Sequence, residues 1–189
     1  MTGKTHQALG VTTGIGYFLL SCPPQYSPAT LGAIAVSSHL SALLPDIDQP
    51  AAEIWHKLPF GHTLGKISDP VLKHRNITHS ILGFALIGTG MFFLFKIFPD
   101  YWGINKNVLI ISSLISYASH ILADMFTVEG VPLLFPYTKM IGIPPRPFEG
   151  IRMMTGKWFE NLVIFPAINL VLIILIIAKW QEIKQILLK

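Results

Sequence analysis

The run VLIISSLISYASHILADMF, residues 108–126, decides the fold. It is long enough to cross a bilayer, since the hydrocarbon core needs about 20 helical residues. Near one end it carries His120 and Asp124. These residues are four apart, so they lie on one face of a helix. Because ionisable residues at membrane depth are costly and usually mark a function, the run predicts a membrane helix with a functional site at one end.

Four further apolar segments can be placed, at residues 8–20, 29–44, 79–98 and 159–178. The last two also reach spanning length, whereas the first two are short and are expected to be tilted, buried or partly inserted. A helix is expected for all of them, because lipid offers no partner to open backbone groups. Charged residues make up 13% of the chain, against about 25% in soluble domains. We therefore predict an all-α, polytopic membrane bundle of about five apolar helices, forming a single domain over residues 1–189.

Two long linkers, residues 46–78 and 127–158, join these segments. Both contain prolines, aromatic residues and basic residues, which predicts a position at the membrane interface with Trp55 and Trp158 as anchors. Five crossings place the N-terminus and both linkers on one side, together with most of the 14 Lys and Arg residues. The positive-inside rule makes that side cytoplasmic. No Lys/Arg cluster with interleaved aromatics appears, so membrane lipids are the expected partners and nucleic acid is not.

The first apolar segment carries two short motifs. Gly10-Val-Thr-Thr-Gly14 is a GxxxG pattern that lets helices approach closely, although ordinary membrane-helix composition explains it equally well. Ser21-Cys22 resembles a lipoprotein cleavage site, and the preceding apolar run has the length of a signal-peptide core. The segment has only Lys4 as a positive charge, and cleavage would discard His6. We therefore expect the segment to be retained.

The other ionisable candidates fall at the same end of the bundle as His120 and Asp124. Each lies directly before or after an apolar segment on the side of the long linkers. Imidazole and carboxylate ligands in this number predict a metal site. The expected ligands are His6, Asp46, Asp48, His74, His79, His120 and Asp124.

Local spacing gives more detail for the ligands beside the apolar segments. Asp46 and Asp48 follow the helix-stopping Pro45, and in an extended stretch residues two apart point the same way. Two carboxylates held together repel, and a divalent cation relieves that repulsion. His6 is expected just before the first segment. Glu160 opens the fifth segment, where the helix dipole already explains an acid, and it is kept as a catalytic candidate.

The remaining histidines have ordinary explanations. For His39, two turns before Asp46, a packing role and a role in the site are equally supported. For His56 and His62, in the first linker, an interfacial packing role is preferred.

Taken together, these motifs resemble those of the YdjM-type, LexA-regulated inner-membrane proteins, a family described as metal-dependent hydrolases. The motifs are Thr5-His6 with Gly10, Leu44-Pro-Asp-Ile-Asp48, His74-Arg-Asn-Ile-Thr-His-Ser80, Ser119-His-Ile-Leu-Ala-Asp124 with Thr127 and Gly130, and Arg152-Met-Met-Thr-Gly156 with Glu160. Asn76 stands where the family usually has Gly. The resemblance implies a metal site and the bacterial cytoplasmic (inner) membrane, and it supports the metal more firmly than any reaction. A more distant similarity links the pattern to zinc-dependent phospholipase C and P1-type nucleases.

The leading functional prediction is a metal-dependent hydrolase of a phosphoester, such as a phospholipid or a lipid-carrier phosphate. The ligands exceed the four of one tetrahedral zinc and suit one or two divalent ions, with zinc preferred and manganese or magnesium as alternatives. Two ions can activate a water and stabilise the leaving oxygen. Arg75 would clamp phosphate oxygens, and Thr78 or Ser80 would hydrogen-bond the substrate or a ligand. A non-enzymatic metal-binding or transport protein, and a structural protein whose metal ties helices together, are the alternatives.

Overall fold

The computed structural model describes residues 1–21, 26–48, 77–97, 99–100 and 102–188, apart from the side chain of Asp48. The described part is all-helical, as predicted, and in place of strands it has two isolated β-bridges, Thr127↔Met153 and Val131↔Ile141. The longer helices are α1 (Gly3–Ser21), α2 (Pro28–Ser41), α5 (Ile81–Ile97), α6 (Lys106–Met125), α7 (Phe165–Ala178) and α8 (Trp180–Leu187). The short ones are η1 (Leu44–Asp48), η2 (Ile77–His79), η3 (Phe148–Ile151) and η4 (Glu160–Ile164), of which η4 is a π-helix.

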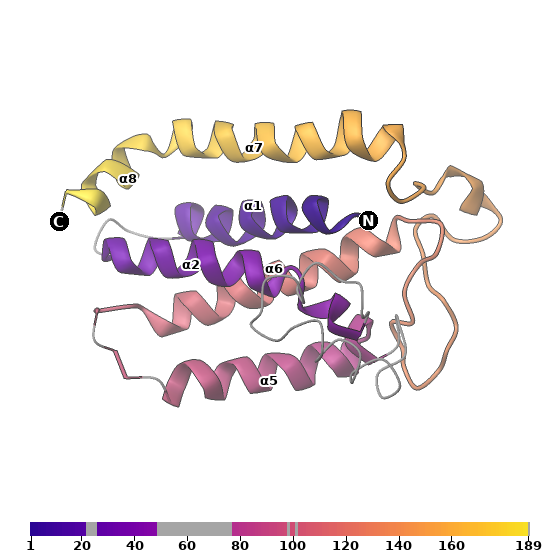
Figure 1. Ribbon diagram of the computed structural model, residues 1–189, viewed down its shortest axis with the longest axis horizontal. Helices are drawn as coiled ribbons and strands as arrows, with labels where there is room; N and C mark the ends of the chain where they lie inside the picture. Colours follow the sequence, from indigo (N-terminus) through magenta and orange to yellow (C-terminus); the bar gives the residue numbers. More distant parts are fainter. Residues whose placement is uncertain (22–25, 49–76, 98, 101, 189) are drawn as a thin grey trace.

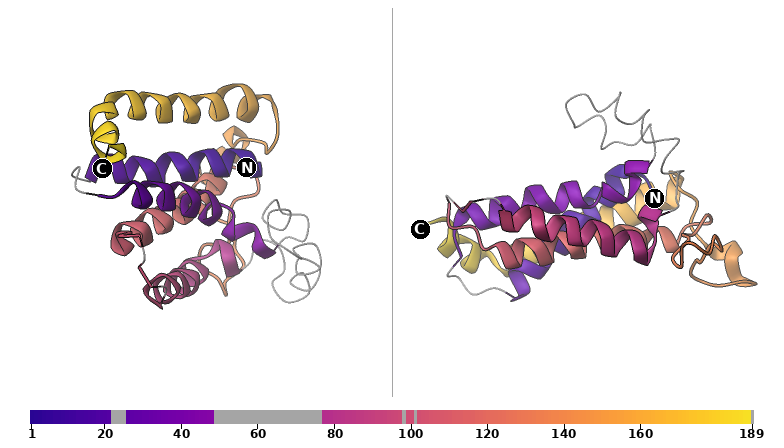
Figure 2. Two further views of the ribbon diagram at one scale, coloured as in Figure 1. Left: turned by 60° about the vertical axis from the view of Figure 1, so that its left-hand side comes forward. Right: turned by 90° about the horizontal axis from the view of Figure 1, so that it is seen from below.

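The five helices α1, α2, α5, α6 and α7 run alternately up and down the long axis of the molecule (Figure 1). The N-terminus, η1, η2 and the start of η4 therefore gather at one end, which is called the site end below. Helices α1, α2 and α6 pack against one another at the centre. Helix α5 packs on α6, and α7 packs on α1, so these two form opposite edges of the bundle (Figure 2, left).

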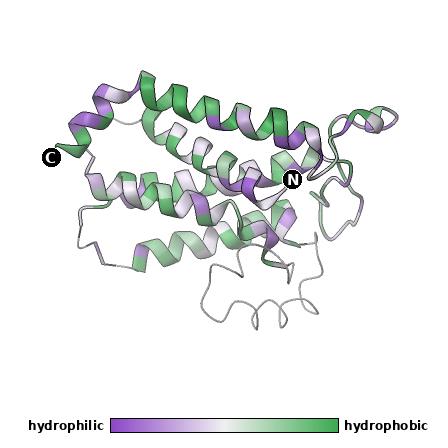
Figure 3. Ribbon diagram, turned by 45° about the horizontal axis from the view of Figure 1, so that its top comes forward, coloured by the Kyte–Doolittle hydropathy of each residue, from purple (hydrophilic) through white to green (hydrophobic). Residues whose placement is uncertain are grey.

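Two helical stretches are long and apolar enough to cross a membrane, Lys106–Met125 and Glu160–Ala178, and Ile81–Ile97 is a shorter apolar helix. Helix α7 is mostly green along its length in the hydropathy view (Figure 3), and none of its residues is buried. An apolar helix without a buried face is typical of a lipid-exposed span. The structure thus contains two to three candidate spans within the five apolar segments predicted.

The close approach of the three central helices depends on small residues. A methyl group at Gly10 would lie 2.3 Å from Cβ of Ala42, and one at Gly14 would lie 2.0 Å from Oγ of Ser38 and 2.7 Å from Oγ of Ser116. Oγ of Ser116 donates to the carbonyl of Gly10 across this contact, at 2.8 Å. The Gly10–Gly14 pattern is therefore a packing motif, as small residues are in other membrane helices.

Two features of the helices differ from the prediction. Helix α1 begins at Gly3, because the backbone amides of Thr5 and His6 already donate to the carbonyl of Thr2. His6 therefore lies inside the helix, and its placement before the first segment was wrong. Helix α8 was not predicted. It is amphipathic, with Ile183 and Ile186 buried against the core at the end of the bundle opposite the site end.

Candidate metal centre

Two ligands of the candidate centre come from the last turns of α6. His120 is fully buried and Asp124 is 1% exposed. They are one helical turn apart, and Nε2 of His120 lies 3.7 Å from Oδ2 of Asp124. The prediction that these residues share one face of a helix is confirmed.

The carbonyl of Ala42, the residue that caps the end of α2, determines which ring nitrogen of His120 carries the proton. Its Nδ1 lies 2.6 Å from the carbonyl oxygen of Ala42, which can only accept, so Nδ1 carries the proton and Nε2 has a lone pair. This Nε2 has no hydrogen-bond partner among the described residues. It lies 3.6 Å from Oδ1 of Asp46. Such a carbonyl-oriented imidazole is the arrangement that metal-binding histidines adopt.

Helix α1 contributes His6, which is buried in the first turns. Its ring stacks on that of His120, with the centroids 3.5 Å apart and the planes 10° from parallel. Its Nε2 lies 3.1 Å from Oδ1 of Asp124. The N-terminal ammonium group of Met1 also contacts Asp124. Helices α1 and α6, more than a hundred residues apart in sequence, are thus joined at this point.

Asp46 of η1 and His79 of η2 complete the group. Nε2 of His79 lies 3.6 Å from both Oδ1 of Asp46 and Oδ2 of Asp124. The neighbouring Thr78 holds this turn in place, because its carbonyl accepts the Tyr117 hydroxyl at 2.6 Å. Oγ1 of Thr78 also lies 3.3 Å from Nδ1 of His79. Two short helices therefore bring ligands from separate motifs to the ends of α1 and α6.

The prediction of an extended stretch at Asp46 and Asp48 was wrong. Residues Leu44–Asp48 form the 3₁₀ helix η1, in which the amide of Asp46 donates to the carbonyl of Leu43 at 3.1 Å. Pro45 fits this turn because it needs no hydrogen-bond partner for an amide and its fixed φ suits the first helical turn. Asp46 consequently enters the cluster from a turn rather than from a strand-like segment.

The charges of the cluster influence one another strongly. Burial opposes ionisation of Asp46, yet His120, His79 and His6 hold the pKa of its carboxyl below the usual range. Burial also opposes a charge on His79, but Asp124 and Asp46 raise its pKa from 6.5 to about 9. In the absence of a metal, a proton therefore occupies His79 at neutral pH. A divalent cation would compete with that proton for the same carboxylates.

The five residues His6, Asp46, His79, His120 and Asp124, called the His/Asp cluster below, fit a metal ion. Two overlapping groups can be distinguished, one of His6, His120 and Asp124 and the other of Asp46, His79 and His120, with donor atoms within 4.8 Å of one another in each. Two ligands bound to one tetrahedral ion at 2.0–2.1 Å are roughly 3.3 Å apart. The nitrogen–oxygen separations of 3.1–3.7 Å are close to this value. Nitrogen and oxygen donors suit zinc and also manganese.

Not every predicted site residue belongs to the cluster. The side chain of Asp48 and the whole of His74 and Arg75 lie outside the described residues. Thr78 is buried beside His79. Glu160 lies apart from the ligands. Its Oε1 accepts from the amide and hydroxyl of Thr2, both at 2.7 Å, and its Oε2 accepts from the amide of Gly156 at 2.7 Å.

Sequence reasoning missed three supporting groups, which are the carbonyl of Ala42, the hydroxyl of Tyr117 and the Thr2–Glu160 contact. Tyr117 precedes His120 by one turn of the same helix, so helical periodicity contained a signal for it. A backbone carbonyl gives no such signal. The contact of Thr2 with Glu160 joins residues 158 apart, and only the folded chain reveals it.

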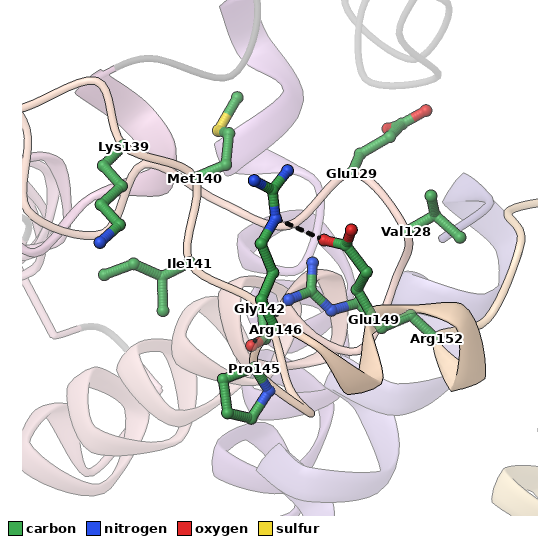
Figure 4. Close-up of a pocket in the computed structure, with 10 residues that line it drawn as sticks. All are labelled: Val128, Glu129, Lys139, Met140, Ile141, Gly142, Pro145, Arg146, Glu149 and Arg152. Carbon is green, nitrogen blue, oxygen red and sulfur yellow. Dashed lines mark hydrogen bonds and ion pairs between the residues drawn. The ribbon is translucent and has the colours of Figure 1, made fainter.

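The largest described cavities do not coincide with the cluster. One of about 680 Å³ lies within residues 128–152, in the second long linker (Figure 4). Three of its charged residues interact within the linker: Arg146 pairs with Glu149 at 2.8 Å, and Arg152 donates to the carbonyls of Pro144 and Gly142. None of the five cluster residues lines it. Volume alone therefore does not identify the functional site here.

Comparison with known proteins gives one consistent result. The family model described as "YdjM inner membrane protein" matches residues 1–186. The chain is 35% identical over 167 residues to the uncharacterized protein YvsG of Bacillus subtilis, which covers 87% of this chain and 88% of that protein. It is also 35% identical over 140 residues to the inner membrane protein YdjM of Escherichia coli, which covers 72% of this chain and 66% of that protein. No solved structure is significantly similar to the chain.

Proposed function

This chain belongs to the family of YdjM inner membrane proteins, and on that premise we propose that it is a membrane-embedded, metal-dependent hydrolase of a lipid phosphoester. The family locates the chain in the bacterial inner membrane. The names of the relatives state no reaction. The proposed reaction is therefore argued from the chemistry of the His/Asp cluster.

The observation that carries the proposal is the buried Nε2 of His120. Its proton lies on the other ring nitrogen, which donates to Ala42, and the lone pair of Nε2 has no hydrogen-bond donor among the described residues. Leaving a buried acceptor without a partner costs about 1–3 kcal/mol. With Asp46 and Asp124 within 3.7 Å of it, a divalent cation is the partner that satisfies all three groups.

A metal ion and the residues in and beside the His/Asp cluster could each take a defined role in hydrolysis. A divalent ion held there would act as a Lewis acid, lowering the pKa of a water and neutralising phosphate charge. The water oxygen would attack phosphorus, the ester P–O bond would break, and a proton would pass to the leaving oxygen. Asp46 is the most exposed ligand, at 18% of its side chain, so substrate would approach from its side. We assign Thr78 as a positioning residue for His79 and Arg75 as the phosphate clamp.

A lipid substrate is supported by where the cluster lies. It occupies one end of a bundle whose α7 is exposed and apolar. In a bilayer of about 30 Å hydrocarbon thickness, such an end lies near the headgroups. The ester phosphates of phospholipids and lipid carriers are found at that depth. A substrate diffusing in the membrane would therefore reach the cluster without leaving it.

A second candidate function is a structural metal that ties the helices together. The specific observation in its favour is that His6, His79, His120 and Asp124 are all no more than 1% exposed. Structural zinc sites are closed, whereas catalytic sites keep an open position. A metal carrier is less well supported, since transporter sites usually lie near the bilayer midplane and this cluster lies at one end.

The test combines metal content with turnover in purified protein. Wild type reconstituted with zinc or manganese is assayed on vesicles of phosphatidylglycerol, phosphatidylethanolamine and phosphatidic acid, and on polyprenyl phosphate. Asp46→Asn is the variant, and Asp100→Asn, exposed in the loop between α5 and α6, is the matched control. We expect the wild type and Asp100→Asn to release product and Asp46→Asn to lose at least about a hundredfold in turnover.

Two outcomes separate the candidates. Bound metal with no turnover on any of these lipids, and a melting temperature that falls on chelation, would favour the structural metal. Turnover that is equal in wild type and Asp46→Asn would contradict the enzyme proposal outright, because the most accessible ligand would then have no part in it.

A further inference from the structure

Two apolar cavities lie in the groove between α5 and α6, and together they are called the α5/α6 furrow. The cavity nearer the site end, about 220 Å³, is lined by Ile81, Phe84, Ala118, Ile121, Leu122 and other apolar residues. The second, about 370 Å³, is lined by residues that include Phe84, Gly88, Phe92, Phe93 and Leu114. Phe84 lines both, so the two cavities adjoin each other along α5.

The lining offers nothing to a polar ligand. Thr89 is the one polar side chain among the residues that line these two cavities, and its hydroxyl donates to the carbonyl of Ala85 at 2.7 Å. Ile81, Leu122 and Phe93 are 56%, 54% and 58% exposed. In a membrane the furrow therefore opens sideways to hydrocarbon, and its occupant must be apolar.

The furrow starts beside the His/Asp cluster. Ile81 follows His79 by two residues, and Ile121 directly follows His120. From Ile81 to Phe93 the furrow runs twelve residues along α5, which is about 18 Å at 1.5 Å per residue. The furrow thus extends from the ligands across more than half the thickness of the hydrocarbon core, which is about 30 Å.

We propose that the α5/α6 furrow seats one acyl chain of the lipid whose phosphate is hydrolysed at the His/Asp cluster. This inference rests on the proposed function. An acyl chain fits better than a second copy of the protein, because a helix with side chains is about 10–12 Å across and does not enter grooves of these volumes. The direction of the furrow places the headgroup of a seated lipid at the site end and its tail in hydrocarbon.

The test fills the furrow by a substitution that leaves every residue of the His/Asp cluster unchanged. Ala118 is exposed on α6 and lines the cavity nearer the site end, so Ala118→Trp places an indole where the chain would lie. Ala167→Trp, at an exposed alanine of α7, is the matched control. Both are assayed on palmitoyl-oleoyl phosphatidylglycerol and on glycerophosphoglycerol, its headgroup without acyl chains, with metal content measured in parallel.

We expect Ala118→Trp to raise the KM for the long-chain lipid about tenfold, because losing about ten of the van der Waals contacts between the acyl chain and the furrow gives a loss of this size. Its turnover of glycerophosphoglycerol, its metal content and all properties of Ala167→Trp should stay within about twofold of wild type. Unchanged KM for the long-chain lipid, or an equal loss on both substrates, would overturn the inference while leaving the enzyme proposal standing.

A second readout separates failure of the furrow from failure of the enzyme. Phosphatidylglycerol with a photoactivatable group in its acyl chain is crosslinked to each variant, and labelled peptides are mapped. We expect labelling of α5 and α6 to exceed that of α7 several-fold and to be lost in Ala118→Trp alone. If the wild type hydrolyses neither substrate, this pattern still decides whether the furrow holds an acyl chain. Labelling in proportion to exposed area, or adducts between two copies of the protein, would overturn the inference.

Discussion

Helix α6 and the stretch Glu160–Ala178 are both long and apolar enough to span a membrane, yet they differ in burial and in the side chains that they turn toward the bundle. In the most apolar 18 residues of each, 67% of the residues are buried in α6 and 0% in Glu160–Ala178. Helix α6 turns serines, His120 and Asp124 inward against α1 and α2, whereas the aliphatic residues of α7 are not buried. Hydropathy alone identifies both as candidate spans. The polar residues of α6 distinguish the helix that organises the site from the one that faces the bilayer.

The largest difference between the two helices is expected when one polar side chain is replaced in each of them. Asp124→Asn removes a charge that contacts three histidines of the cluster, and loss of one partner from a buried ionic group costs about 3–5 kcal/mol. Asn169→Ala removes the α7 side chain that donates to the carbonyl of Phe165 and should cost about 1 kcal/mol or less. Thermal unfolding and elemental analysis measure both. Equal effects would mean that α6 has no special place in the fold.

The next largest effect is expected from a change of pH, through His79 of η2, which contacts Asp124 of α6. The pKa of His79 is raised from 6.5 to about 9. In metal-free protein this stabilisation is therefore complete below pH 6.5 and is lost as the pH rises through about 9. A metal ion bound at His79 displaces this proton, so the metal-loaded protein does not lose this stabilisation as the pH rises. The difference in the free energy of unfolding between metal-loaded and metal-free protein should thus grow from pH 6.5 to 8.5, by up to about 1.4 kcal/mol per pH unit.

Measurements of metal-loaded and chelated protein at pH 6.5, 7.5 and 8.5 test this sign. A difference that shrinks with rising pH would show that protons and metal do not compete at His79. The matching variant is His39→Ala, which removes an imidazole outside the His/Asp cluster. It should leave the pH dependence as in wild type.

Much of this contrast between helices could be predicted from the sequence, because it depends on local spacing. His120 and Asp124 are one turn apart in an apolar run, and that alone placed them on one face at one end. Alternation of the segments then brought Asp46 and His79 to the same end. These predictions needed only helix geometry and the direction of the chain across the membrane.

The details that failed depend on contacts between remote segments. Extension of α1 to Gly3, which puts His6 inside the helix, occurs at an end where Thr2 contacts Glu160, far away in sequence. The 3₁₀ turn at Asp46 packs against η2. Helix α8 was overlooked because a search for long apolar runs cannot detect an eight-residue amphipathic helix, whose Ile183 and Ile186 are buried in the same hydrophobic cluster as Phe18 and Leu109.

The packing of α6 on α1 gives a third, smaller test. Gly14→Ala forces a methyl group to within 2.0 Å of Oγ of Ser38 and 2.7 Å of Oγ of Ser116, which should cost about 2 kcal/mol by overpacking. Gly32→Ala on α2 meets no atom within 4 Å, and should be neutral or stabilising by up to about 1 kcal/mol. Denaturation in detergent compares them. If Gly14→Ala were harmless, α1 could move away from α6 freely, and the cluster would not depend on this contact.

The smallest expected effect concerns the link between the lipid-facing span and the cluster. Glu160 accepts from Thr2 and Gly156, and the hydroxyl of Thr2 lies 2.9 Å from that of Thr5, which directly precedes His6. Glu160→Gln keeps the shape but replaces one acceptor oxygen with a donor. Because supporting groups of this kind change metal affinity by about 10–100-fold, we expect a loss near the lower limit, about tenfold.

Competition with a metal-binding dye measures that affinity, and turnover is compared at saturating metal. A positioning role predicts that excess metal restores turnover in Glu160→Gln. Turnover that stays low at full occupancy would instead place Glu160 among the catalytic residues, as its position at the start of the fifth segment allows. In that case the stretch Glu160–Ala178 would supply a catalytic residue, and α6 would no longer be the only one of the two helices that contributes to the site.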